Sequence, residues 1–299
     1  MQEFRVDEIS NGKYHFSISG VSYIGNPLSN TAMYISKKVE RLLENLKNVR
    51  ECLIFAEDTI EVPAELSVEN CFVLCRSPQK EYAQFVTNWA AEMDSENRKR
   101  KYTLAPGGYY VGDNVTIGRD AYIEPGCVIS HDVTIGDRAV IKMGARIENC
   151  TVGDDFIACE NCTVGTTGFT MADDDDGNKM RIPTLGRVII GNHVEIGALT
   201  NVSRGSAGNT EIHDCVKLDS LVHIGHDVVL HRNVEIPAGA IIGGFDELME
   251  GAYVGINAVL RNRIKVGEHA FIGMGAVVTK SVEANTTVVG NPAKPFERK

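Results

Sequence analysis

The sequence predicts a parallel β-helix of hexapeptide repeats that follows a small α/β domain, and three observations support this fold class. An aliphatic residue recurs at every sixth position from Ile212 to Val278. Glycine often follows this residue, and glycine permits the tight corners with positive φ that such a coil needs. Residues 1 to about 100 lack the period. A period of six fits neither a helix nor an ordinary strand, and it is typical of a solenoid in which three short strands complete one coil of about 18 residues.

The first domain, residues 1–100, combines strand and helix patterns. Its hydrophobic clusters predict strands at Tyr14–Ile24, Arg50–Phe55 and Cys71–Cys75, and helices at Asn30–Leu46 and Gln79–Ala91. The charged stretch 95–101 is predicted to link this domain to the repeats. The all-β repeat domain then occupies residues 101–299.

The repeat is interrupted in three places. It keeps its register from Val111 to Ile147 and drops one residue before Val152. A large insertion occupies residues 165–187, and a smaller one lies at 203–211. Loops that interrupt a regular solenoid cost little stability and can build a site. We therefore expect substrate contacts first in the larger insertion.

That insertion carries the acidic run Asp173–Asp176. Such runs are usually solvated loops, which is the favoured interpretation. Carboxylate oxygens also bind Mg²⁺ or Ca²⁺, and the same loop could offer hydrogen-bond acceptors to a sugar.

Composition excludes several classes of function. The chain has 299 residues, of which 43% are hydrophobic and 23% charged, and a net charge of −10. That charge argues against a nucleic acid as the main partner. No apolar run approaches the roughly 20 residues of a membrane helix, and we find no secretion signal. The eight cysteines form no disulfide framework. We expect a cytoplasmic protein without integral membrane contact.

Two further metal sites can be considered, and the sequence favours neither. Cys159 and Cys162 form a C-x-x-C pair that has no second pair and no adjacent histidine, so we predict buried thiols. His223, His226 and His231 resemble the ligand set of a zinc hydratase, but they occupy different phases of the repeat. We predict no metal site.

Several motifs resemble the UDP-3-O-(3-hydroxyacyl)glucosamine N-acyltransferases of the lipid A pathway. In the repeat domain they are Gly168-Phe169, Ile182–Gly191, Val194–Gly197, Arg204-Gly205 and His223–His226. In the first domain ISGVSYIGNPLSNTAMYIS and SPQKEYAQFVTNW resemble that family's nucleotide-recognition domain. The resemblance covers most of the chain. It implies a left-handed β-helix and a homotrimer with a site in each cleft between neighbouring solenoids.

The resemblance also implies catalytic roles. It makes His226 the general base that takes a proton from the sugar amine during attack on an acyl thioester. It makes Asp219 the acidic partner that orients this imidazole. The repeat adds an independent expectation, because Gly244 follows His226 by one coil of 18 residues. Its backbone N–H is then placed to bind the oxyanion of the tetrahedral intermediate.

Five further residues are expected to bind substrate. Phe169 and Arg204 belong to the shared motifs, and His223 lies near the base. The family's uracil sandwich is missing, since its positions hold Met33, Ser36 and Val39. Neighbouring Tyr34 could stack instead. Arg263 stands at or near a further family histidine, where an arginine suits a phosphate or carboxylate.

The segment Ala276–Pro295 resembles the end of coenzyme-A-dependent sugar acetyltransferases. In that resemblance Lys280, Asn291 and Lys294 bind the donor, and the lysines meet the phosphates of coenzyme A. The alternative is that Gly290-Asn-Pro-Ala293 only ends the solenoid. We find no counterpart of the helical tail that lipid A enzymes use for the acyl-carrier protein. A short acyl-CoA, most simply acetyl-CoA, is therefore the expected co-substrate, with no permanently bound cofactor.

The predicted function is transfer of an acyl group from a thioester to the amine of a nucleotide-linked amino sugar. Two enzymatic alternatives stay open, a lipid A N-acyltransferase that uses acyl-carrier protein and an acetyltransferase for a polysaccharide sugar. The alternative from another class is an inactive solenoid that binds a ligand or scaffolds a partner.

Overall fold

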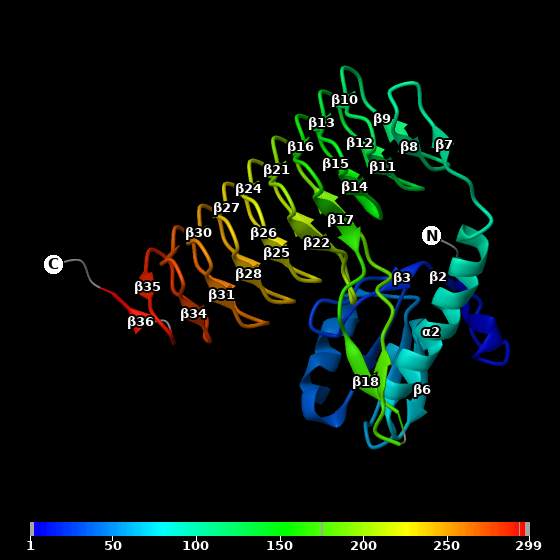
Figure 1. Ribbon diagram of the computed structural model, residues 1–299. Coiled ribbons are helices and arrows are strands. Elements are labelled where there is room, and N and C mark those ends of the chain that lie inside the picture. The colour runs from blue at the N-terminus through cyan, green and yellow to red at the C-terminus, as the bar shows by residue number, and fades with distance from the viewer. Residues whose placement is uncertain (1–2, 175, 293, 297–299) are drawn as a thin grey trace. The chain divides into compact units, whose positions relative to one another are not determined.

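The computed structural model describes residues 3–174, 176–292 and 294–296. The chain forms two compact units (Figure 1). The first unit comprises Met1–Lys99, Phe169–Gly186 and Ser206–Gly208. The second unit comprises the remainder and is a parallel β-helix. No helix among the described residues is long and apolar enough to cross a membrane.

Three sheets form the sides of the β-helix (Figure 1). The first sheet contains β10 (Tyr122–Ile123), β13 (Val140–Ile141), β16 (Ile157–Ala158), β21 (Glu195–Ile196), β24 (Lys217–Leu218), β27 (Glu235–Ile236), β30 (Tyr253–Val254), β33 (Phe271–Ile272), β35 (Thr287–Val289) and β36 (Lys294–Pro295). The second sheet contains β7 (Thr103–Leu104), β8 (Tyr110–Val111), β11 (Val128–Ile129), β14 (Arg146–Ile147), β17 (Thr163–Thr166), β22 (Asn201–Ser203), β25 (His223–Ile224), β28 (Ile241–Ile242), β31 (Val259–Leu260) and β34 (Val277–Val278). The third sheet contains β9 (Thr116–Ile117), β12 (Thr134–Ile135), β15 (Cys150–Val152), β20 (Val188–Ile190), β23 (Thr210–Ile212), β26 (Val229–Leu230), β29 (Glu247–Leu248) and β32 (Lys265–Val266).

The aliphatic residues that recur with a period of six form the core of the β-helix, as predicted. Every aliphatic residue of the series from Ile212 to Val278 lies in a strand and is buried. Full burial of one such side chain stabilises the fold by roughly 1.5–3 kcal/mol, so the ladders account for much of the stability. The parallel register joins residues one coil apart, as in Ile224 with Ile242. At the position of the dropped residue the inward-facing register is kept, because Ile135 pairs with Val152 although they are 17 residues apart.

The first unit contains a four-stranded parallel sheet in the order β3 (Gly20–Val21), β4 (Thr31–Ile35), β5 (Leu53–Glu57) and β6 (Cys71–Cys75). Its other elements are β1 (Phe4–Arg5), η1 (Val6–Glu8), β2 (Ser17–Ile18), η2 (Lys37–Asn48), α1 (Leu66–Glu69) and α2 (Pro78–Asn97). The helix predicted at Asn30–Leu46 is wrong in its first part, because β4 is a strand. Its residues are almost all buried within the parallel sheet, and this environment favours a strand over the local helical pattern.

The large insertion forms a hairpin that packs with the first unit. Its strands are β18 (Met171–Asp173) and β19 (Lys179–Arg181), paired antiparallel. Ala172, Ile182 and Leu185 are buried in the same hydrophobic cluster as Trp89 of α2. The loop that leaves the repeat is therefore structurally part of the first unit.

The acidic run lies at the tip of this hairpin. Asp173 pairs with Lys179, and Asp174 accepts hydrogen bonds from the backbone and side chain of Asn178. Asp175 lies outside the described residues. Where the structure describes the chain, no group of histidine, cysteine or acidic residues is arranged to hold a metal ion. Cys162 is fully buried, and burial raises the pKa of its thiol to about 12.

Candidate active site

The corner between β25 and β26 joins a histidine to a carboxylate. Asp227 has a φ of 59°, and this left-handed conformation turns its side chain toward the preceding residue. Nδ1 of His226 lies 2.7 Å from Oδ2 of Asp227, and the two side chains are only 16% and 5% exposed. A carboxylate on Nδ1 holds an imidazole in the tautomer whose Nε2 accepts protons. The pair therefore has the geometry that a general base and its orienting group require.

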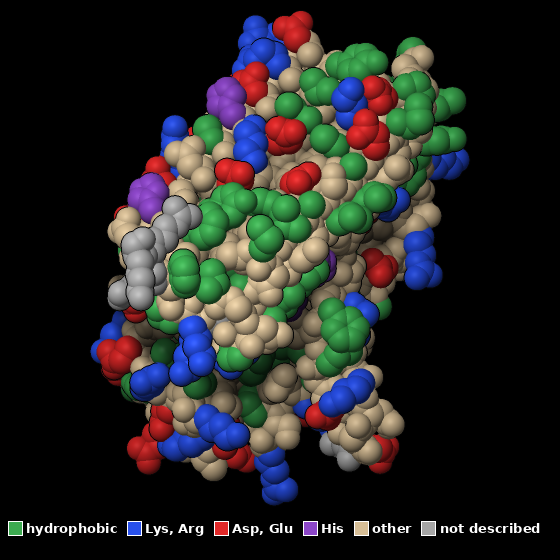
Figure 2. Space-filling model, turned by 60° about the vertical axis from the view of Figure 1, so that its left-hand side comes forward, with side chains coloured by type: hydrophobic (Ala, Val, Ile, Leu, Met, Phe, Trp, Pro, Cys, Tyr) green, Lys and Arg blue, Asp and Glu red, His purple; other side chains and the backbone are tan. Residues whose placement is uncertain are grey.

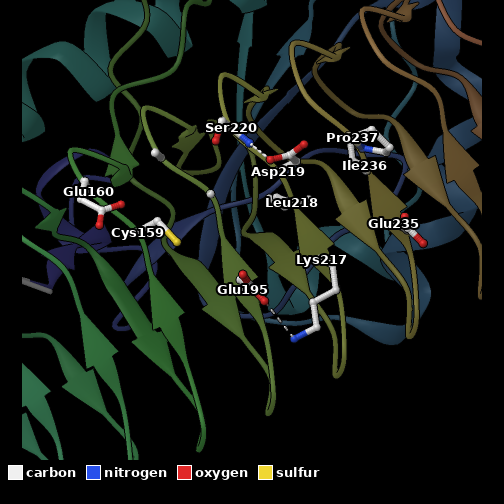
Figure 3. A pocket seen from close by; sticks show the side chains of 12 residues that line it. Cys159, Glu160, Glu195, Lys217, Leu218, Asp219, Ser220, Glu235, Ile236 and Pro237 are labelled. Carbon is white, nitrogen blue, oxygen red and sulfur yellow. Dashed lines mark hydrogen bonds and ion pairs between the residues drawn. The ribbon is translucent and has the colours of Figure 1, made fainter.

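Asp219 does not occupy the position expected for it. It follows β24, on a different corner of the coil, where its Oδ1 accepts the backbone N–H of Ser220 at 2.7 Å. It lines a hollow of about 450 Å³ together with Cys159, Glu160 and Lys217 (Figure 3). One side of the coil contains about six residues. Asp219, seven positions before His226, therefore lies at the preceding corner of the coil. The acidic partner of His226 within this chain is Asp227.

Gly244 lies against the ring of His226, one coil farther along. A Cβ atom added to Gly244 would stand 2.8 Å from both Nε2 and Cε1 of His226, so only glycine leaves the ring in place. The backbone N–H of Phe245 donates to the carbonyl oxygen of His226 at 3.0 Å. Its ring meets the imidazole edge to face, with centroids 5.2 Å apart. These contacts fix the proton-accepting side of the imidazole beside the Gly244 backbone.

Arg263 continues this stack on the next coil. Its guanidinium carbon lies 4.1 Å from the centroid of the Phe245 ring, which is a cation–π contact. Its backbone N–H donates to the carbonyl oxygen of Gly244 at 3.1 Å. His226, Phe245 and Arg263 thus follow one another on three successive coils. The arrangement presents a fixed positive charge two coils from the candidate base.

His223 lies on the outward face of β25 and pairs in register with Asn201 and Ile241. Desolvation by its surroundings, and then the nearby charge of His226, lower the pKa of His223. The ring therefore favours its neutral form, which can donate or accept a hydrogen bond beside His226.

The other expected β-helix contacts lie at different points along the coil. Arg204 follows β22, which pairs with β25, and in that register it stands one coil before His226. Its backbone N–H donates to the carbonyl oxygen of Thr166. Lys280 lies on the same corner as His226, three coils farther along, about 14 Å away at one strand spacing per coil. Farther along the chain, Asn291 lies in the turn after β35, and Lys294 begins β36, the last strand of the first sheet.

Phe169 and Tyr34 belong to the first unit. Phe169 is 73% exposed, and the guanidinium of Arg181 lies over its ring at 5.1 Å. Tyr34 packs on Tyr82, with ring centroids 5.2 Å apart, and contacts the hydrophobic cluster. Phe169 offers an accessible aromatic face, whereas Tyr34 contributes to packing.

Asp246 is a buried carboxyl that the sequence analysis did not identify. It is 1% exposed, in a position that other coils fill with Val228 or Ile264. Its Oδ1 accepts the backbone N–H of Ile264 at 2.7 Å, and Oδ2 has no hydrogen-bond partner among the residues that the structure describes. Burial raises the pKa of Asp246 to about 7. The six-residue period could have identified Asp246, because this acidic residue interrupts an inward-facing aliphatic ladder.

Comparison with known sequences supports the repeat assignment. The family model described as "Bacterial transferase hexapeptide (six repeats)" matches residues 114–149 and 209–244. A UDP-3-O-acylglucosamine N-acyltransferase of Caulobacter sp. (strain K31) is 37% identical over 147 residues, which are 49% of this chain and 43% of that protein. The enzyme of the same name from Methylorubrum extorquens (strain PA1) is 36% identical over 158 residues, 51% of this chain and 43% of that protein. The chain thus matches less than half the length of these relatives.

Solved structures agree on the fold. A UDP-N-acetylglucosamine acyltransferase from Campylobacter jejuni aligns with a TM-score of 0.55 and 25% identity, over 65% of this chain and 74% of that chain. The UDP-N-acetylglucosamine O-acyltransferase from Moraxella catarrhalis aligns with a TM-score of 0.57 and 20% identity, over 64% and 73%. This chain is a hexapeptide-repeat protein with a left-handed β-helix, and over about half of its length it is homologous to UDP-3-O-acylglucosamine N-acyltransferases.

Proposed function

We propose that this protein transfers an acyl group from a thioester to the amine of a nucleotide-linked amino sugar, with His226 as general base. The observation that carries the proposal is the placement of the imidazole between Asp227 on Nδ1 and the Gly244 backbone beside Nε2. The names of the relatives support an N-acyltransferase, and a glucosamine derivative is the acceptor in those names.

The geometry suits a direct attack. The sugar nitrogen attacks the thioester carbonyl carbon while Nε2 of His226 takes a proton from that nitrogen. The carbonyl oxygen becomes an oxyanion, and we assign its stabilisation, by roughly 3 kcal/mol, to the backbone N–H of Gly244. The carbon–sulfur bond then breaks, the thiol leaves with the proton from the imidazolium, and an amide remains. Asp227 stabilises the imidazolium between these steps.

An acyl-CoA is the favoured donor. Lys280 stands on the same corner as His226, about 14 Å along it at one strand spacing per coil. A pantetheine arm extended along that corner would bring the thioester to His226 and a phosphate to Lys280. Asn291 and Lys294 are candidates for further contacts with the nucleotide end of the donor. An acyl-carrier protein as donor, as in a lipid A enzyme, is the alternative.

Arg263 is proposed to bind the acceptor. The guanidinium fixed over Phe245 suits an anionic group such as a diphosphate. Phe169, His223 and Arg204 are further candidates, and the exposed Phe169 ring suits stacking on a base or a sugar. Tyr34 packs on Tyr82, so we assign it no direct contact with a base.

We propose a homotrimer that works in the cytoplasm. Hydrophobic side chains on the outside of the β-helix support an assembly (Figure 2). Ile241 and Val259 of the second sheet are 38% and 39% exposed on neighbouring coils. One coil face cannot enclose both substrates, so a second copy would complete each site. All eight cysteines are free thiols, which suits a reducing compartment.

A donor and acceptor panel tests this function. Acetyl-CoA, a longer acyl-CoA and an acyl-carrier protein loaded with a hydroxyacyl chain are each offered to UDP- and dTDP-linked amino sugars. Release of the thiol and formation of the sugar amide are measured together. We expect amide formation with acetyl-CoA. Turnover only with the acyl-carrier protein would select the lipid A alternative, and no transfer to any amine would favour an inactive binding solenoid.

A further inference from the structure

Thr210 places a hydroxyl in an aliphatic ladder of the β-helix core. The inward-facing residues at this corner are otherwise largely hydrophobic, among them Val188, Val228 and Ile264. Thr210 pairs in register with Val188 and is 0% exposed. A buried hydroxyl costs free energy unless it forms a hydrogen bond, so its partner indicates what it does.

The partner of Thr210 is the turn that carries the candidate base. Its Oγ1 accepts the backbone N–H of Asp227 at 2.9 Å. Asp227 holds the left-handed conformation that aims its carboxylate at His226. The equivalent corner residues Phe245 and Arg263 share this conformation, and at each of the three corners the backbone N–H of that residue donates a hydrogen bond that anchors the turn. Asp227 therefore connects Thr210 to the imidazole: its backbone N–H donates to the Thr210 hydroxyl, and its carboxylate contacts Nδ1 of His226.

The neighbouring coils explain why a side chain supplies this contact. On the next two coils the equivalent N–H groups donate to main-chain oxygens, Phe245 to His226 and Arg263 to Gly244. In the register of β22 with β25, the corresponding acceptor for Asp227 would be the carbonyl oxygen of Arg204. The chain leaves the repeat just after it, where residues 206–208 group with the first unit. Thr210 begins β23 directly after this excursion and offers a hydroxyl where a carbonyl would otherwise stand.

We infer that Thr210 is a positioning residue of the reaction. By accepting the Asp227 N–H it fixes the turn, and the turn fixes the carboxylate on Nδ1 of His226. This inference rests on the proposed role of His226. A small displacement of a general base can lower a rate by one to two powers of ten, so the hydroxyl should matter to kcat.

The test compares two threonines of the same core. Thr210→Val keeps the shape of the side chain and removes the acceptor, whereas Thr210→Ser keeps the hydroxyl. Thr200→Val is the matched control, because Thr200 is also 0% exposed and its Oγ1 accepts the N–H of Val222 at a different corner. Each full-length variant is assayed with the active donor and acceptor, beside His226→Ala. Deuterium exchange of the Asp227 amide provides a readout that needs no substrate.

We expect Thr210→Val to lower kcat about tenfold with KM within about twofold, and to speed exchange at Asp227. Thr210→Ser should restore most of the rate, and Thr200→Val should leave kcat within about twofold despite a similar loss of stability. Two results would overturn the inference and leave the proposed function intact. One is an equal loss of kcat in both valine variants. The other is an unchanged kcat in Thr210→Val while His226→Ala is inactive. Full turnover in His226→Ala overturns both. If the Thr210→Val variant does not fold, Thr210→Cys is tested instead, because its sulfur is a weak hydrogen-bond acceptor.

Discussion

Nδ1 of His226 lies 2.7 Å from the carboxylate of Asp227, the residue that follows it in the chain. The contact depends on the left-handed turn at Asp227 and is largely buried. A histidine held in this way differs from a surface histidine at a solenoid corner, because a carboxylate orients its ring and favours the tautomer with the proton on Nδ1.

The partner of the base can be tested by replacing the two candidate acids in turn. Asp227→Asn removes the negative charge that stabilises the imidazolium and favours the wrong tautomer, so kcat should fall at least a hundredfold. Asp219→Asn changes a carboxylate on a different corner and should cost less than about threefold. Steady-state kinetics of both variants checks this, and the reverse order would restore Asp219 as the orienting group.

The close approach of Gly244 predicts a steric effect. In Gly244→Ala the new methyl would stand 2.8 Å from Nε2 of His226, so the ring must move and kcat should fall about a hundredfold. Gly251→Ala is a more severe control, because its methyl also meets a histidine ring, that of His269, at another corner, and its φ of 68° adds backbone strain. Circular dichroism should show that both variants fold. A Gly244→Ala variant with normal kcat would remove this glycine from the site.

Arg263 is expected to act on substrate affinity. Arg263→Gln should raise the KM of the anionic substrate about tenfold with little change in kcat, since a charge-assisted contact is lost. Arg263→Lys should restore the KM only in part, because an ammonium cannot stack flat on the Phe245 ring. Arg261→Gln, at an exposed arginine two residues earlier, provides the control. Equal KM values for the two glutamine variants would contradict this role.

Asp246 predicts how stability depends on pH. Burial raises its pKa to about 7, so the folded state keeps a proton that the unfolded chain releases near pH 4. Stability contributed by this group is therefore complete at low pH and is lost as pH rises toward about 7, by at most 1.4 kcal/mol per pH unit.

Asp246→Asn removes this titration. Urea unfolding at about pH 5 and about pH 8 should show that the variant gains free energy of unfolding relative to the parent at the higher pH. The expected relative gain is on the order of a few kcal/mol. The same pH dependence in both proteins would mean that Asp246 is already ionised in the folded state.

The repeat made the β-helix and part of the site predictable. A period of six identifies each inward-facing residue, and coils of 18 residues place Gly244 over His226 without any structure. The choice of Asp227 as partner could not be predicted this way, because the period does not say which of two nearby carboxylates turns toward the imidazole. The association of residues 169–186 with the first unit depends on packing between distant segments. No local pattern contains that information.

The central claim is that His226 removes the proton from the attacking amine. Its most direct measurement is the rate of amide formation by His226→Ala, compared with His131→Ala. His131 has the same phase in the repeat, but its Nδ1 accepts the backbone N–H of Asp113. We predict that His226→Ala lowers kcat by at least a thousandfold, while His131→Ala stays within about threefold of the parent. A His226→Ala protein that forms the amide at the parental rate would contradict the account.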